Sequence, residues 1–68
     1  MKSYWWICVI MHTYRGEYAY KGTEVVKTAT KSEAERTATI QHQDKHPLCG
    51  FFEVVDVLGP FDKKPQEA

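Results

Sequence analysis

This sequence has no excess of positive or negative charge, and it contains little cysteine. Nine basic residues balance nine acidic ones, so the formal net charge is zero. Proteins that bind the phosphate backbone usually carry a basic excess, because clustered Lys and Arg displace the counterions of nucleic acid. The balance argues against a strong nucleic-acid binder. The two cysteines, Cys8 and Cys49, are too few for a disulfide framework.

Long apolar runs are also missing. The longest run covers residues 4–11, whereas a transmembrane helix needs about 20 apolar residues. A signal peptide would show a small-residue cleavage site after its apolar core, and this run is not followed by one. Its residues are mostly β-branched and aromatic, which favours a strand. We therefore expect a cytoplasmic protein with free thiols and no membrane association.

What the sequence does contain is enough apolar material for one small core. Its 68 residues leave room for a single domain, and 43% of them are hydrophobic. Disorder of the whole chain is therefore not expected. We predict one α+β domain over residues 1–60 and a flexible, polar C-terminal tail over residues 61–68.

Three segments have the pattern of strands. Both alternating sets of residues 4–11 are apolar, as in a strand covered on both faces, so this segment is predicted to be central. Residues 23–29 are β-prone, and the charges of Glu24 and Lys27 suggest an edge strand. Residues 50–58 form the last strand, which we expect to end at Gly59 and Pro60.

The connection between the first two strands has two interpretations. Residues 12–23 contain two glycines. Either a tight turn at residues 15–17 joins two long strands, or a longer loop carries three tyrosines. The sequence alone does not separate these alternatives.

One helix is predicted between the second and third strands. Thr30 and Glu33 form a capping-box pattern at its start, and Pro47 ends it after His46. The inner stripe of this helix is small and weakly apolar. We expect it to consist of Ala34, Thr37, Ala38 and Gln41, with Ile40 at its margin.

These elements predict a β-β-α-β domain with a mostly antiparallel sheet in the order 2-1-3 and one helix on one face. The sequence does not say which face the helix covers. The uncovered face would still be apolar, and soluble monomers rarely expose large apolar patches. We therefore expect a homodimer that packs through the sheet face opposite the helix.

His42, His46 and Cys49 have a spacing that resembles part of a metal site. Histidines at i and i+4 share a helix face, and a Cys just beyond the helix could reach the same point. A fourth ligand is not evident, although Cys8 or His12 would serve if the fold brought it near. The simpler interpretation is two solvated histidines at a helix C-terminus. We therefore predict no bound metal and no cofactor.

Catalysis is not expected. Cys49 with His46, or Cys8 with His12, would make a nucleophile and base only with an orienting third group and oxyanion donors. The sequence contains no nucleophile elbow and no glycine-rich phosphate loop. Cys8 lies in the most apolar run and is more simply a small buried hydrophobe.

Tyrosines alternate with basic residues in the segment 12–31, which holds four basic and two acidic residues, a net charge of +2. Such residues bind either a protein surface or single-stranded nucleic acid. We expect a small non-enzymatic regulator or adaptor that binds itself and a second, unidentified protein. The alternative is a nucleic-acid-binding regulator that uses this hairpin. The candidate interface residues are Trp5, Trp6, Tyr14, Arg15, Tyr18, Tyr20, Lys21 and Phe52.

Overall fold

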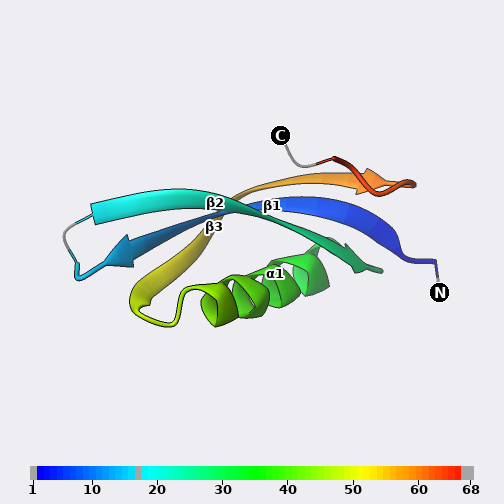
Figure 1. The fold of residues 1–68 in the computed structure, drawn as a ribbon. Coiled ribbons are helices and arrows are strands. Elements are labelled where there is room, and N and C mark those ends of the chain that lie inside the picture. Colours follow the sequence, from blue (N-terminus) through cyan, green and yellow to red (C-terminus); the bar gives the residue numbers. More distant parts are fainter. Residues whose placement is uncertain (1, 17, 67–68) are drawn as a thin grey trace.

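A computed structural model describes residues 2–16 and 18–66, except for the side chain of Tyr18. It contains one sheet and one helix (Figure 1). The elements are β1 (Tyr4–Tyr14), β2 (Tyr18–Thr28), α1 (Lys31–Lys45) and β3 (Cys49–Phe61). The strand order is β2-β1-β3, and β1 is antiparallel to both neighbours. The predicted α+β class, β-β-α-β topology and strand order are therefore confirmed.

The turn between β1 and β2 is tight, which decides between the two alternatives for residues 12–23. Arg15 and Gly16 both have positive φ angles, 55° and 70°, in the left-handed region that glycine tolerates best. Tyr14 pairs with Tyr18 directly across the turn. Both strands of the hairpin are consequently eleven residues long.

Helix α1 begins as its capping pattern predicts. The Glu33 backbone N–H donates to Thr30 Oγ1 at 3.2 Å, and the Thr30 hydroxyl donates to Glu33 Oε1 at 3.0 Å. At the other end His46 is the C-cap, and its backbone N–H donates to the carbonyls of His42 and Gln43. Pro47 follows and disfavours further helix. No helix among the described residues is long and apolar enough to cross a membrane.

The helix covers the sheet face that carries the even-numbered residues of β1. The buried apolar core consists of Trp6, Cys8, Ile10, Val26, Ala34 and Ala38. The predicted helix stripe was only partly correct, because Thr37 and Ile40 are exposed and His42 is buried after Ala34 and Ala38. The buried positions therefore follow a strict spacing of four residues, which keeps them on one side of the helix.

Two further expectations need correction. Trp6 belongs to this core, where its indole N–H donates to the Thr28 carbonyl at 3.1 Å, so its ring is not part of a free binding surface. Strand β3 does not end at Gly59 but continues to Phe61, which pairs with Trp5. Gly59 has a φ of 136°, and a Cβ there would lie 2.9 Å from the Trp5 carbonyl oxygen. Glycine thus permits the irregularity that lets the strand continue.

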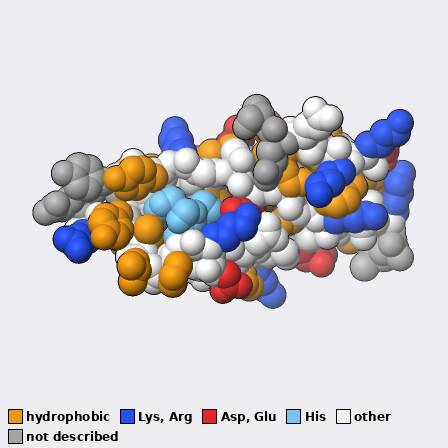
Figure 2. Space-filling model, viewed as in Figure 1, with side chains coloured by type: hydrophobic (Ala, Val, Ile, Leu, Met, Phe, Trp, Pro, Cys, Tyr) orange, Lys and Arg blue, Asp and Glu red, His pale blue; other side chains and the backbone are white. Residues whose placement is uncertain are grey.

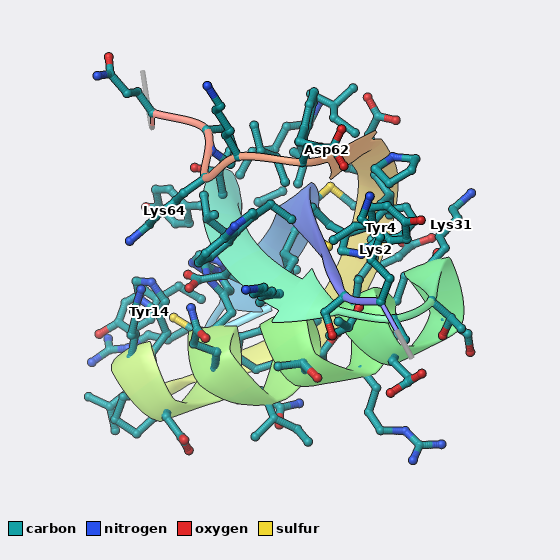
Figure 3. All side chains as sticks on the ribbon, turned by 90° about the vertical axis from the view of Figure 1, so that its right-hand side faces the viewer. Lys2, Tyr4, Tyr14, Lys31, Asp62 and Lys64 are labelled. Carbon is teal, nitrogen blue, oxygen red and sulfur yellow. The ribbon has the colours of Figure 1, made fainter. Side chains whose placement is uncertain are left out.

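The residues after β3 return over the sheet on the side away from the helix. Figure 3 shows Asp62 and Lys64 above the sheet and the helix below it. The Lys2 ammonium lies 3.3 Å from an Asp62 carboxylate oxygen. The Lys64 ammonium lies 5.6 Å from the centre of the Trp5 ring, and the Lys27 ammonium lies equally close. This segment therefore covers one end of the outer face.

Candidate functional site

Three histidines meet where the C-terminal end of α1 crosses the sheet. His12 continues the even-numbered face of β1 beyond Trp6, Cys8 and Ile10, and His42 and His46 continue the helix stripe. One ring nitrogen from each histidine lies within 4.8 Å of the others. His42 is only 2% exposed, His12 is buried and His46 is half-buried. Figure 2 shows the histidine side chains reaching the surface as one group.

His42 is the centre of this cluster. Its Nδ1 lies 2.9 Å from Glu24 Oε2, and its Nε2 lies 2.8 Å from His12 Nδ1. Since an ionised carboxylate can only accept, the Glu24 contact fixes the proton of His42 on Nδ1. The His46 ring centre lies 4.5 Å from that of His42 and 4.7 Å from that of His12.

Glu24 is a buried carboxylate that the sequence pattern presented only as an edge-strand charge. It is 2% exposed and accepts three side-chain hydrogen bonds. The donors are Gln41 Nε2 at 2.6 Å, His42 Nδ1 at 2.9 Å and Lys45 Nζ at 2.8 Å. Burial disfavours its ionised form, but the bonds from Lys45, His42 and Gln41 outweigh burial and lower the pKa of Glu24. It therefore carries a negative charge beneath the helix.

The surroundings of His12 favour the neutral form of its ring. Burial lowers the pKa of His12, and the neighbouring His42 and His46 lower it further. A neutral imidazole has a lone pair on one of its nitrogens, and this lone pair can accept a proton or bind a metal ion.

Glycine and aromatic residues shape the walls of the cluster. A Cβ at Gly22 would lie 2.7 Å from Cε1 of His42, so only glycine lets this ring rest against β2. Tyr20 stacks on His12 with ring centres 5.8 Å apart. Phe52 lies 5.8 Å from the ring centres of both His12 and His42. The cluster is therefore held between β2, β3 and the helix.

The two cysteines lie outside this cluster. Cys49 begins β3 and pairs with Tyr14, and it is not among the residues whose ligand atoms converge. Cys8 is buried in the core, and burial, followed by the charges of Glu35 and Glu24, raises its pKa to about 11. A thiol with so high a pKa is a poor nucleophile at neutral pH. Both cysteines are free, as predicted.

The sequence-based interface candidates do not form one surface. Consecutive strand residues point to opposite faces, so Tyr20 lies on the helix side and Lys21 on the outer side. Arg15 lies at the hairpin tip with its guanidinium 5.3 Å from the Tyr14 ring centre. The side chain of Tyr18 is outside the described residues. Because Tyr20 and Lys21 lie on opposite faces and Arg15 lies at the tip, the candidate residues do not form one continuous base-stacking platform.

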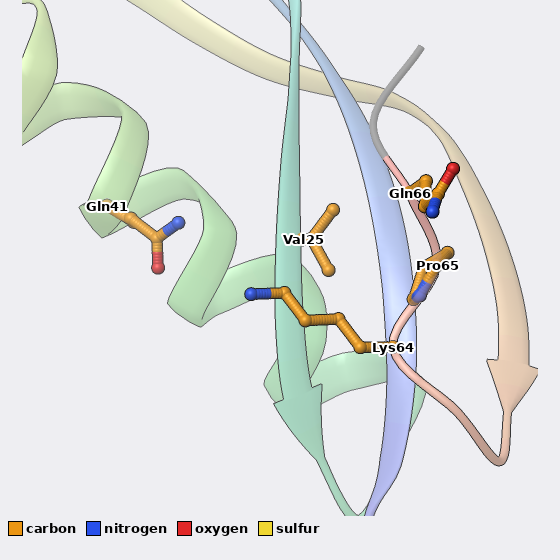
Figure 4. Close-up of a pocket in the computed structure, with 5 residues that line it drawn as sticks. All are labelled: Val25, Gln41, Lys64, Pro65 and Gln66. Carbon is orange, nitrogen blue, oxygen red and sulfur yellow. The ribbon is translucent and has the colours of Figure 1, made fainter.

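The outer face of the sheet is the second candidate region. Residues that pair directly with Trp5, Ile7, Val9 and Met11 share its side. Its apolar part consists of Trp5, Ile7, Val9, Met11, Val25, Leu58 and Phe61. Leu58 is 46% exposed and Phe61 is 37% exposed. Figure 4 shows Lys64 extending past Val25 across the edge of β2 toward Gln41, so the C-terminal segment lies over one end of this face.

Comparison with known protein families, with curated proteins and with solved structures finds no match to this chain. The geometry of these two regions is therefore the basis for inferring function.

Proposed function

We propose that this protein is a small non-enzymatic binding module that self-associates through the outer face of its sheet. The observation that carries the proposal is the apolar surface on the side away from α1. It extends over all three strands, and Leu58 and Phe61 are exposed on it. Water-exposed apolar surface of this kind favours association, because burying it removes it from water.

The charges that flank this surface favour a second copy as the partner. Lys21 and Lys27 lie on the outer side of β2, since they pair with Met11 and Trp5. Glu53 and Asp56 lie on the outer side of β3, since they pair with Met11 and Val9. One edge of the face is therefore basic and the other acidic. The whole chain has a formal net charge of zero, so two copies do not repel each other overall.

This charge pattern favours one arrangement of the two sheets. A two-fold axis parallel to the strands places β2 of each copy over β3 of the other. Lys21 and Lys27 then face the acidic edge of the partner. A two-fold axis perpendicular to the strands would instead place β2 of one copy over β2 of the other and bring like charges together. Paired sheets pack about 10 Å apart, so long side chains at both edges can meet.

Sedimentation equilibrium at micromolar concentration tests the proposal. We expect a mass near twice the 7.9 kDa of one chain. The substitution Leu58→Glu should convert the protein to a monomer by placing a charge in the interface. Ile40→Glu is the matched control, because Ile40 is 54% exposed but lies on the helix. A wild-type mass of one chain, or a dimer that survives Leu58→Glu, would reject this interface.

The charge arrangement has its own test. Lys21→Glu and Glu53→Lys should each weaken the dimer, and the double substitution should restore it. If the single substitutions leave the dimer unchanged, or the double variant remains weak, the arrangement of β2 over the partner's β3 is incorrect.

A further inference from the structure

We infer that His12, His42 and His46 form a binding site for a divalent transition-metal ion, with Zn²⁺ as the best-matched ion. The site is separate from the outer face, since it lies under the helix on the opposite side of the sheet. The inference replaces the expectation of no bound metal. That expectation depended on a ligand set of His42, His46 and Cys49, whereas the fold supplies His12 as the third ligand.

The donor atoms suit this class of ion. Imidazole nitrogen is a borderline ligand that favours zinc and its neighbours over calcium or magnesium, which prefer oxygen. Zinc–nitrogen bonds of about 2.0–2.1 Å in a tetrahedral site separate ligand atoms by about 3.3 Å. Here Nε2 of His42 and Nδ1 of His12 are 2.8 Å apart, and all three histidines offer a nitrogen within 4.8 Å. The three nitrogens are therefore grouped at close to the spacing that a tetrahedral ion requires.

The Glu24 carboxylate completes the environment that a histidine ligand usually has. Metal-bound histidines commonly donate their second ring N–H to a carboxylate, which fixes the tautomer and increases ligand basicity. His42 has this contact, with Nδ1 2.9 Å from Glu24 Oε2. Its Nε2 therefore carries the lone pair, which accepts from Nδ1–H of His12 at 2.8 Å; an ion bound between the two rings would take the place of that proton. The negative charge of Glu24 also offsets part of the charge of a bound cation.

His46 distinguishes this arrangement from a simple buried hydrogen-bond network. Among the described residues, its ring has contacts with His12 and His42 but no side-chain hydrogen bond. Its nitrogens are therefore available to an ion that enters from solvent. The half-buried position of His46 leaves an access route, and three protein ligands leave a fourth position for water or a small external ligand.

Zinc titration tests the inference. The untagged protein is first stripped of metal with a chelator, and zinc binding is then measured by competition with a chromophoric chelator. We expect one ion per chain. His46→Ala removes a ligand, so it should weaken binding by more than about 100-fold, because losing a residue that only hydrogen-bonds to a ligand costs about 10–100-fold. Glu24→Gln should weaken it within that 10–100-fold range. Cys49→Ser is the matched control and should leave the affinity unchanged.

Cobalt substitution supplies an independent readout of the ligands. Co²⁺ bound at this site should give an intense visible spectrum of a four-coordinate ion without a sulfur charge-transfer band. Circular dichroism should confirm that each variant is folded. Absence of stoichiometric zinc binding by the wild type, wild-type affinity in folded His46→Ala, or loss of binding in Cys49→Ser would overturn the inference.

Discussion

The two ends of the interface between α1 and the sheet have the same geometry, but one end is apolar and the other is lined by histidines. At the N-terminal end, Ala34 and Ala38 pack against the large side chains of Trp6 and Ile10. Four residues further along the same stripe, His42 takes the place of a third small apolar residue. On β1, the even-numbered apolar series likewise ends in a histidine.

This difference separates the residues that stabilise the fold from the residues that are placed to bind a ligand. A small domain has a thin margin of stability, and a buried polar group is unfavourable unless it is fully hydrogen-bonded. Here the polar end is satisfied among the described residues, with Glu24 accepting three bonds. A core that served stability alone would not need this network. We therefore assign stability to the apolar end and ligand binding to the histidine end.

The largest expected effect concerns the apolar end. Ile10 is fully buried, so Ile10→Ala should lower the free energy of unfolding by about 2–5 kcal/mol through lost burial and the cavity left behind. Urea denaturation in the presence of a chelator measures this. Val55→Ala is the control, because Val55 is exposed and should change stability by no more than about 0.5 kcal/mol. Equal losses in both variants would contradict the assignment of stability to this end.

Zinc should act only through the histidine end. At about 100 times the dissociation constant, it should stabilise the folded protein by about 2.7 kcal/mol, a rise in Tm of roughly 10–20 °C for a domain of this size. His42→Leu should abolish this rise, while Ile10→Ala should keep it. Calorimetry with and without zinc measures both. An undiminished rise in His42→Leu would show that the ion binds elsewhere.

Two glycines allow a finer test of the histidine end. Gly22→Ala would place a Cβ 2.7 Å from His42, so the ring must move, at a cost in stability of about 1–3 kcal/mol. Zinc affinity should fall as well. At Gly50 nothing lies within 4 Å of an added Cβ, so Gly50→Ala should leave zinc affinity unchanged. Similar zinc affinities in the two variants would show that His42 is not a zinc ligand.

The smallest expected effect concerns the reactivity of the two cysteine thiols and not the stability of the fold. Burial keeps the pKa of Cys8 at about 11, so its thiol remains protonated at pH 8, whereas Cys49 is only half-buried. Alkylation of the folded protein at pH 8 should therefore add one label, at Cys49, and alkylation after unfolding should add two. Mass spectrometry reads the count. Rapid labelling of both cysteines in the folded protein would show that the apolar end opens readily.

Much of the fold was predictable because its signals are local. The charge-free run of residues 4–11 identified the central strand, and Thr30 with Glu33 located the helix start. The inward orientation of Glu24 was not predictable, because it depends on the register of the hairpin. Glu24 pairs with Cys8 and so shares its face. A turn longer by one residue would shift the register and turn Glu24 to solvent, and the turn length was the point that the sequence left open.

The same limit applied to the histidines. The spacing of His42 and His46 showed that they share a helix face, and the ring contact between them confirms it. Whether that face points inward depends on the rotation of α1 about its axis. The spacing of four residues from Ala34 through Ala38 would have indicated this rotation. His12 lies 30 residues before His42, and only the antiparallel sheet with a returning helix brings them together.

Anomalous diffraction from crystals of the untagged protein, grown with one equivalent of zinc, tests whether the three histidines hold the ion. We predict one strong anomalous peak at the zinc absorption edge, about 2.0–2.1 Å from a nitrogen of each of His12, His42 and His46. Nδ1 of His42 should still donate to Glu24. A peak held by Cys49, a peak confined to a lattice contact, or no peak among the three histidines would contradict the account.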